Sequence, residues 1–220
     1  MAFTTLDVQA RLHALGFEPG PLDGLMGPRT RAALDAALAQ RRARSAAELF
    51  HPSGLHRIIL HWTAGAYGDI ALERASYHLL ILEDGRAVPG DWKPEANATC
   101  VTGRYAAHTR ALNTGSIGVA LDAMAGAVEH PFSVGCYPIT RVQLDAMATE
   151  VADLCLTYDI PVSRWTVLTH AEVQPTLGIW QRAKWDITWL PGMATPGDPV
   201  AVGDRLRAMI RAALPIRRAA

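Results

Sequence analysis

Three short, almost unbroken apolar runs constrain the fold of this chain more strongly than any other feature of its sequence. They cover residues 56–62, 116–121 and 165–169, and a fourth run at 78–83 is followed by a hairpin signal, Asp84-Gly85. Runs that are apolar throughout are typical of strands buried on both faces of a sheet. Helical spacing follows over residues 140–158 and 202–214. The sequence therefore predicts an α/β fold, a mixed central sheet flanked by helices, with a small N-terminal helical module.

The first 45 residues differ in pattern from the rest of the chain. Apolar residues at helical spacing end at Gly16, a loop rich in glycine and proline follows, and a second helix begins at Arg29. We expect a helical module over residues 1–45, a linker over 46–53 and the larger α/β domain over 54–220.

The charge balance and the apolar content exclude several classes of partner. The chain has 21 basic and 21 acidic residues, so it has no overall field that would attract nucleic acid or an acidic membrane. No apolar run approaches the roughly 20 residues that span a bilayer, and the opening residues lack a signal-peptide pattern. We expect a monomer that is cytoplasmic at synthesis, with no membrane insertion. The three cysteines are too few and too scattered for a disulfide framework.

Two histidines, His61 and His170, stand where an apolar run gives way to a polar loop. The end of a rigid strand can hold an imidazole in a fixed orientation, as a zinc site requires. A histidine at a strand end is also commonly a hydrogen-bonded structural residue. These two positions alone leave both interpretations open.

The surrounding motifs favour the metal site. In order and spacing, they resemble the zinc-dependent N-acetylmuramoyl-L-alanine amidases of the phage-lysozyme and peptidoglycan-recognition-protein superfamily. The motifs are His61-Trp62-Thr63-Ala64-Gly65, Ser76-Tyr77-His78, Ala107-His108, Ser116-Ile117-Gly118 and Thr169-His170-Ala171-Glu172.

The resemblance implies roles for individual residues. It places zinc ligands at His61, His170 and Asp186, and catalytic residues at Tyr77 and Lys184. Zinc with three protein ligands can activate water and polarise the amide carbonyl. A cation at Lys184 would then lie beside the developing oxyanion, and the phenol of Tyr77 would hydrogen-bond the water or shuttle a proton.

Two departures from the family pattern leave alternatives open. Lys184 follows His170 by 14 positions, a longer connection than usual, so Glu172 within it is a rival third ligand. Some cytoplasmic recycling members have a catalytic glutamate where this chain has Ala120. His108 is either a wall of the substrate cleft or a structural residue. Trp180 and its neighbouring tryptophans either stack on sugars or pack in the core.

The N-terminal segment resembles a small helical peptidoglycan-binding module. The matching residues are Val8-Gln9, Leu12, Leu15-Gly16-Phe17, Pro19-Gly20, Asp23-Gly24, Gly27, Thr30 and Ala33. The resemblance implies substrate contacts at Asp23 and Thr30, although the module's usual ending is replaced here by alanine-rich sequence.

Together the two resemblances imply a peptidoglycan hydrolase that uses Zn²⁺ to cleave the amide between N-acetylmuramic acid and L-alanine. Peptidoglycan is then the partner, and the expected role is that of an endolysin acting on the cell wall after release. A cytoplasmic muropeptide-recycling amidase and a non-enzymatic peptidoglycan-binding receptor remain the alternatives.

Overall fold

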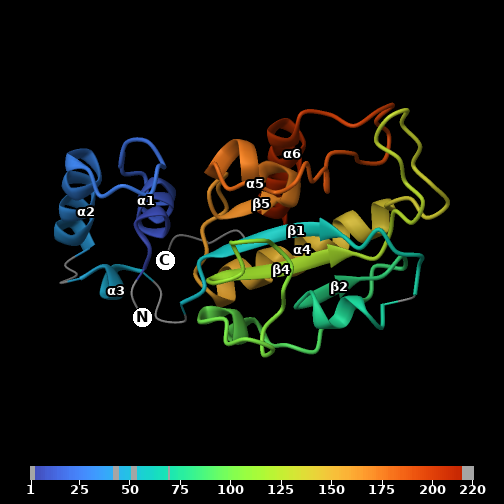
Figure 1. Cartoon of the computed structure of the whole chain (residues 1–220), viewed down its shortest axis with the longest axis horizontal. Coiled ribbons are helices and arrows are strands. Elements are labelled where there is room, and N and C mark those ends of the chain that lie inside the picture. Colours follow the sequence, from blue (N-terminus) through green and yellow to red (C-terminus); the bar gives the residue numbers. More distant parts are fainter. Residues whose placement is uncertain (1–2, 42–44, 51–53, 69, 215–220) are drawn as a thin grey trace.

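The apolar runs form one mixed sheet in the computed structural model, which describes residues 3–41, 45–50, 54–68 and 70–214 (Figure 1). The strand order is β3-β2-β4-β1-β5, and only the hairpin of β2 with β3 is antiparallel. The α/β prediction is confirmed. The strands are β1 (Arg57–Trp62), β2 (Leu79–Ile81), β3 (Ala87–Pro89), β4 (Ser116–Leu121) and β5 (Val167–Thr169).

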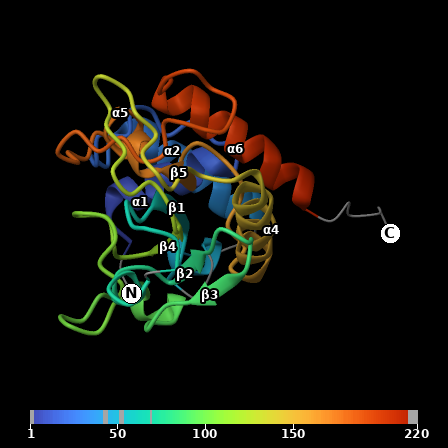
Figure 2. The same cartoon turned by 90° about the vertical axis from the view of Figure 1, so that its right-hand side faces the viewer.

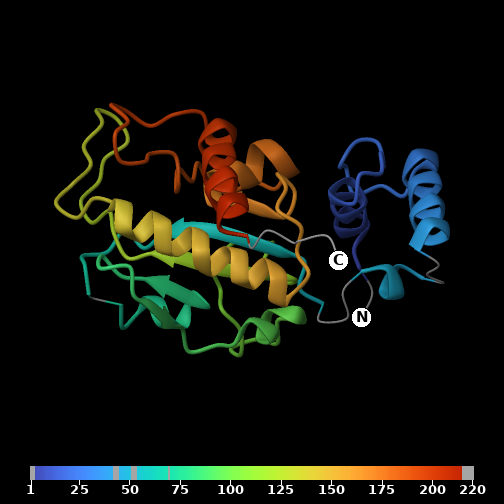
Figure 3. The ribbon, with the colours of Figure 1, turned by 180° about the vertical axis from the view of Figure 1, so that it is seen from behind.

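Helices cover both faces of the sheet, which explains why β1 and β4 are buried along their whole length. Helices α4 (Arg141–Thr157) and α6 (Pro199–Ala213) lie in front of the sheet in Figure 3, and they pack with Ile58 and Leu60. Helix α5 (His170–Leu177) packs on the other face, against Ile59. Because side chains alternate along a strand, His61 points to the same face as Ile59.

Side-chain caps fix where two of these helices begin. Thr140 accepts a hydrogen bond from the backbone of Gln143 at the start of α4, and Thr169 does the same with Glu172 at the start of α5. Both are capping boxes.

Two short 3₁₀ helices, η1 (Glu73–Ala75) and η2 (Pro94–Ala98), lie in the connections before and after the hairpin. Figure 2 views the sheet from the side.

The N-terminal helices have a small apolar cluster of their own. Helices α1 (Thr5–Ala14) and α2 (Pro28–Arg41) agree with the expected pair, and α3 (Ala46–Leu49) falls within the expected linker. Phe50 packs into this cluster, and residues 51–53 lie outside the described residues. The domain boundaries themselves stay a prediction. Among the described helices, none has the length and apolar character to cross a bilayer.

The N-terminal helices lie beside the amino end of β1 (Figures 1 and 3), and charged side chains attach them to it. One carboxylate oxygen of Asp7 lies 2.7 Å from Nε2 of His56 and 3.0 Å from Nη2 of Arg57. Arg11 donates a hydrogen bond to the carbonyl of Leu55 at 2.7 Å. Since Arg57 is buried, Asp7 neutralises a charge that would otherwise be costly to desolvate.

Candidate metal centre

His61 and His170 come together because β1 and β5 are adjacent parallel strands. His61 is the fifth residue of β1, and His170 follows directly on β5 as the first residue of α5. Parallel strands bring their carboxyl ends to one edge of the sheet, where ligand sites of such folds lie. The two imidazole rings are 4.7 Å apart between centroids.

Asp186 joins them from the loop that follows α5. Its backbone carbonyl accepts a hydrogen bond from the amide of Ala171 at 2.7 Å, which ties this loop to the start of the helix. Its Oδ2 lies 3.0 Å from Nδ1 of His61 and 3.1 Å from Nδ1 of His170. One donor atom from each of these buried residues lies within 4.8 Å of the other two. Two imidazoles and one carboxylate therefore converge on one point.

The protonation states suit a metal site. Burial lowers the pKa of His61 to about 4, so its imidazole is neutral and can offer a lone pair. Burial would raise the pKa of Asp186, but its polar contacts with His170 and His61 outweigh that effect and lower the pKa to about 2. The carboxylate is therefore ionised at neutral pH.

Gln181 fixes the orientation of the His170 ring. Its amide nitrogen donates to the carbonyl of Arg110 at 2.9 Å, so its Oε1 faces Nε2 of His170 at 3.0 Å. When the ring proton lies on Nε2, as the Gln181 contact favours, the lone pair of Nδ1 and Oδ2 of Asp186 face the same point, where a shared cation would take the place of the proton that otherwise joins them. A shared cation stabilises such a pair, so the residues present fit a metal ion.

Thr109 and His108 contact His61, the other histidine among the candidate ligands. Nε2 of His61 lies 3.3 Å from Nδ1 of His108 and 3.3 Å from Oγ1 of Thr109. His108 is 8% exposed, and a Cβ on Gly118 would lie 2.5 Å from its ring, so a glycine is required on β4. His108 thus contacts a candidate ligand directly. It also lines a cavity of about 470 Å³ that it shares with His170 and Lys184.

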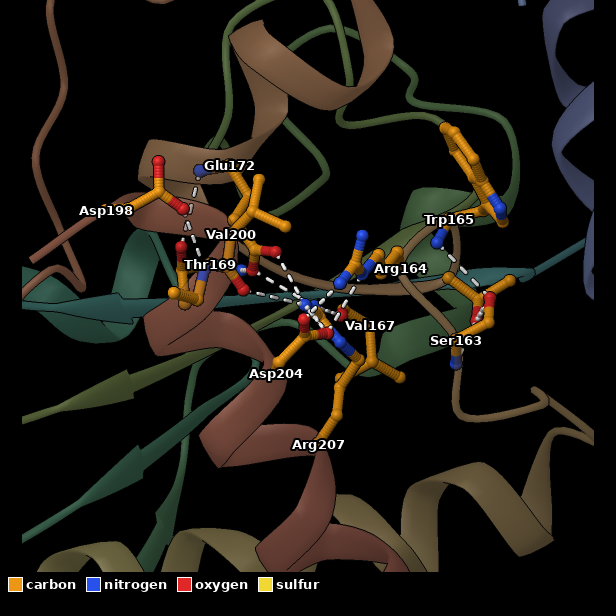
Figure 4. Close-up of polar contacts among 12 residues, drawn as sticks. Ser163, Arg164, Trp165, Val167, Thr169, Glu172, Asp198, Val200, Asp204 and Arg207 are labelled. Atoms are coloured by element: carbon orange, nitrogen blue, oxygen red, sulfur yellow. Dashed lines mark hydrogen bonds and ion pairs between the residues drawn. The ribbon is translucent and has the colours of Figure 1, made fainter.

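Glu172, the rival third ligand, lies outside the cluster. Figure 4 shows its carboxylate turned to Arg207 of α6, with oxygen-to-nitrogen distances of 2.7 and 3.0 Å. It is fully buried and also caps the amide of Thr169 at 2.8 Å. Its carboxylate is already committed to Arg207 and the helix cap. Among the described residues, the structure favours Asp186 as the third ligand.

Tyr77 and Lys184 line a cavity of about 380 Å³ beside the three candidate ligands. The ring centroid of Tyr77 lies 5.1 Å from that of His61, and burial raises the pKa of its hydroxyl, which keeps the phenol protonated. Lys184 is exposed and also borders a second cavity of about 470 Å³, shared with His108 and His170. Tyr77 and Lys184 thus share one cavity with the candidate ligands His170 and Asp186.

Comparison with known proteins identifies the family of this chain. A sequence model described as N-acetylmuramoyl-L-alanine amidase matches residues 51–192, which include the three candidate ligands. The chain belongs to this amidase family. It is a peptidoglycan amidase, and the bond that gives the family its name joins N-acetylmuramic acid to L-alanine. A comparison of this chain with curated proteins found no match.

Several solved structures are similar to the amidase. N-acetylmuramoyl-L-alanine amidase LysC from Clostridium intestinale URNW is 16% identical, with 72% of this chain and 88% of that chain covered and a TM-score of 0.43. AmiD from E. coli, solved with anhydro-N-acetylmuramic acid-L-Ala-D-gamma-Glu-L-Lys, is 21% identical over 76% and 75%, with a TM-score of 0.39. Drosophila peptidoglycan recognition protein SA is 16% identical over 55% and 70%, with a TM-score of 0.37.

The tryptophans near the last motif of the amidase take different positions. Trp189 is buried, and Trp185 packs edge-on against Trp62 with 4.6 Å between centroids. Trp180 is 57% exposed, and the guanidinium groups of Arg110 and Arg182 lie 5.0 and 5.7 Å from its ring centroid. Of these, only Trp180 offers a surface for stacking.

In the N-terminal part of the amidase, Asp23 and Thr30 lie far from the candidate metal centre in sequence. Their side chains form hydrogen bonds that stabilise the loop between α1 and α2. Gln9 donates to a carboxylate oxygen of Asp23 at 3.0 Å and lies 3.2 Å from the hydroxyl of Thr30. Thr30 is 2% exposed and donates to the carbonyl of Pro19 at 2.9 Å. These contacts give both side chains a structural role; their predicted contact with substrate stays a prediction.

Proposed function

We propose that the ion held by His61, His170 and Asp186 is zinc, and that the amidase is a zinc-dependent peptidoglycan hydrolase. The observation that carries the proposal is the convergence of two imidazole nitrogens and one carboxylate oxygen, buried and within 4.8 Å of one another. Two histidines and one carboxylate form a donor set known from catalytic zinc sites, which leave a position open. When bound, zinc supplies Lewis acidity to the scissile carbonyl and acidifies the attacking water.

The chain's own residues supply the remaining chemistry. Lys184 places an ammonium group at the edge of the cavity, where it can stabilise negative charge that develops on the carbonyl oxygen. Tyr77, held protonated by burial, can donate a hydrogen bond inside the same cavity. Because Ala120 pairs with His61 across β1 and β4, strand β4 contributes no carboxylate at that level. Proton handling therefore falls to Tyr77.

The intact donor set argues against a non-enzymatic receptor, which needs only to hold the muropeptide. The resemblance of the N-terminal helices to a peptidoglycan-binding module supports action on polymeric wall material. We therefore propose an endolysin that works as a monomer and reaches the wall after release from the cell in which it is made.

Two measurements test the proposed function. Purified protein should contain about one zinc per chain by elemental analysis, and it should release L-alanine-terminated peptides from purified sacculi. Active protein without zinc would overturn the metal assignment. Cleavage of soluble muropeptides with no cleavage of sacculi would favour the recycling amidase instead.

A further inference from the structure

A cavity of about 530 Å³ lies between the N-terminal helices and the sheet, away from the metal centre. This volume falls in the range of about 300–1,000 Å³ that is usual for small-molecule sites. The N-terminal part contributes one wall and the amidase domain the other. The lining residues are Phe3, Thr4, Leu6 and Asp7 on one side, and Gly54, His56, Ala98, Thr99, Ala111, Leu112, Thr114 and Ile179 on the other.

The lining favours a neutral ligand that has both apolar and polar groups. Apolar side chains such as Leu6 and Ile179 alternate with hydroxyls such as that of Thr114, and none of the described residues that line the cavity is a lysine or arginine. The negative charge of Asp7 is already paired with His56 and Arg57. Among the described residues, a peptide stem with free carboxylates therefore finds no lysine or arginine in this cavity, and its one histidine is already paired with Asp7. A pyranose ring with an acetamido group presents apolar C–H and methyl surfaces together with hydroxyl and amide groups.

Strong contacts hold the two walls in fixed positions. Asp7 and Arg11 of α1 bind the amidase domain at His56, Arg57 and Leu55, as described above. The ring of His13 adds a further contact, since its centroid lies 4.8 Å from that of Trp165. A cavity held open by such contacts needs little ordering when a ligand binds.

Leu6 of α1 shows how the module contributes to the cavity. It is only half-buried, and it is absent from the apolar cluster that Val8 and Leu12 build inside the module. It lines the cavity instead. A large aliphatic side chain that faces a cavity between two parts of a chain is available for contact with a ligand.

The same two loops border this cavity and the cavity next to the metal centre. Ala111 and Ile179 line the first, while Arg110 and Gln181 line the second. Trp180, exposed between them, lies at this boundary. A polymer that is cut at the metal centre and extends past Trp180 would therefore reach the cavity.

We propose that this cavity binds an N-acetylated sugar of the glycan strand whose peptide is cut at the metal centre. The proposal rests on the proposed function, since it takes the same polymer as ligand. It places glycan contact at Leu6 and the amino end of α1 rather than at Asp23 and Thr30.

The test uses the full-length, zinc-loaded protein and the trimer of N-acetylglucosamine as the probe. Titration followed by methyl NMR should shift the resonances of Leu6 and Leu112. Leu6→Trp and Thr114→Trp, which fill the cavity from opposite walls, should each weaken trimer binding about tenfold or more. Leu25→Trp is the matched control, because Leu25 is 68% exposed on the same module and does not line the cavity, so it should bind like the wild type.

Two results would overturn the proposal: no shifts at Leu6 and Leu112 in the wild type at millimolar trimer, or equal affinity in the two cavity-filling variants and the control. The wild-type NMR arm decides the matter even if a tryptophan variant does not fold. Hydrolysis of a soluble muropeptide by the wild type is measured alongside. Cleavage without trimer binding would reject this cavity as a sugar site alone, whereas the absence of cleavage would reject the proposed function.

Discussion

Nε2 of His170 lies 3.0 Å from Oε1 of Gln181, and this contact decides which nitrogen of the ring faces Asp186. Gln181 is buried, and its own orientation is fixed through the carbonyl of Arg110. The nitrogen of His170 that faces the candidate metal position is thus selected by a residue outside the set of candidate ligands.

Replacing Gln181 should therefore weaken metal binding. We expect Gln181→Leu to lower zinc affinity by about 10–100-fold, the usual effect of removing a partner of a ligating histidine. Gln181→Glu keeps an acceptor oxygen and should retain more of the affinity. Competition with a chromophoric chelator measures both. Equal zinc affinity in Gln181→Leu and wild type would show that the ring is oriented by other contacts.

Substitution of Asp186 should affect zinc binding, whereas substitution of Glu172 should affect the stability of the fold. Asp186→Ala should lose zinc while it stays folded, because it removes a candidate ligand. Glu172→Ala leaves the buried guanidinium of Arg207 without its main partner and should lower the free energy of unfolding by about 3–5 kcal/mol. Zinc content and urea unfolding separate the two. Loss of zinc in a folded Glu172→Ala, with zinc kept in Asp186→Ala, would reverse the assignment.

Lys184 should matter for turnover and not for metal content. We expect Lys184→Ala to keep stoichiometric zinc and to lose about 10²–10³ in kcat, as when one oxyanion donor is removed. Lys93→Ala is the matched control, since Lys93 is exposed and does not line the cavity around the candidate ligands. Steady-state kinetics on a soluble muropeptide provide the readout. A kcat for Lys184→Ala within a few-fold of the control would exclude this role.

Asp7 should contribute to the stability of the whole chain. Asp7→Asn removes the charge that faces the buried Arg57, and we expect a loss of roughly 3 kcal/mol in the free energy of unfolding. Asp35→Asn, on the exposed face of α2, should change it little. Urea unfolding compares the two variants. The same free energy of unfolding in both variants would mean that solvent stabilises the charge of Arg57 in the absence of Asp7.

Zinc should stabilise the fold by mass action. A ligand that binds only the folded state at 100 times its Kd adds about 2.7 kcal/mol at 25 °C, so chelation should lower Tm and readdition of zinc should restore it. The His61→Ala variant should show no such shift, because it lacks a candidate ligand. An unchanged Tm of the wild type on chelation, with full activity, would argue against a resident metal.

The sequence predicted the sheet well because the signals of its strands are local. Apolar runs identify β1 and β4, and the capping residue Thr140 begins α4 as expected. His61 and His170 could be recognised as strand-end residues before their partners were known. Asp186 needed the family resemblance, since nothing local distinguishes its carboxylate from that of Glu172.

Contacts between distant loops could not be predicted. Gln181 reaches the carbonyl of Arg110, 71 positions earlier in the chain, and such a pairing leaves no periodic pattern. The only signal was its place in a connection longer than usual. The ion pair of Asp7 with Arg57 is likewise invisible until the module docks. The helical turn of α3 in the expected linker depends on burial of Phe50 against the module.

Strand β1 carries the docking contact of the module at one end and a candidate metal ligand at the other. His56, next to the first residue of the strand, contacts Asp7, and His61 lies five residues further on. At a rise of about 3.3 Å per residue, these two points are about 16 Å apart along a rigid, fully buried strand. The strand therefore fixes the distance between these two points. A ligand bound at the junction with the module would thus lie at a set distance from the candidate metal ligands.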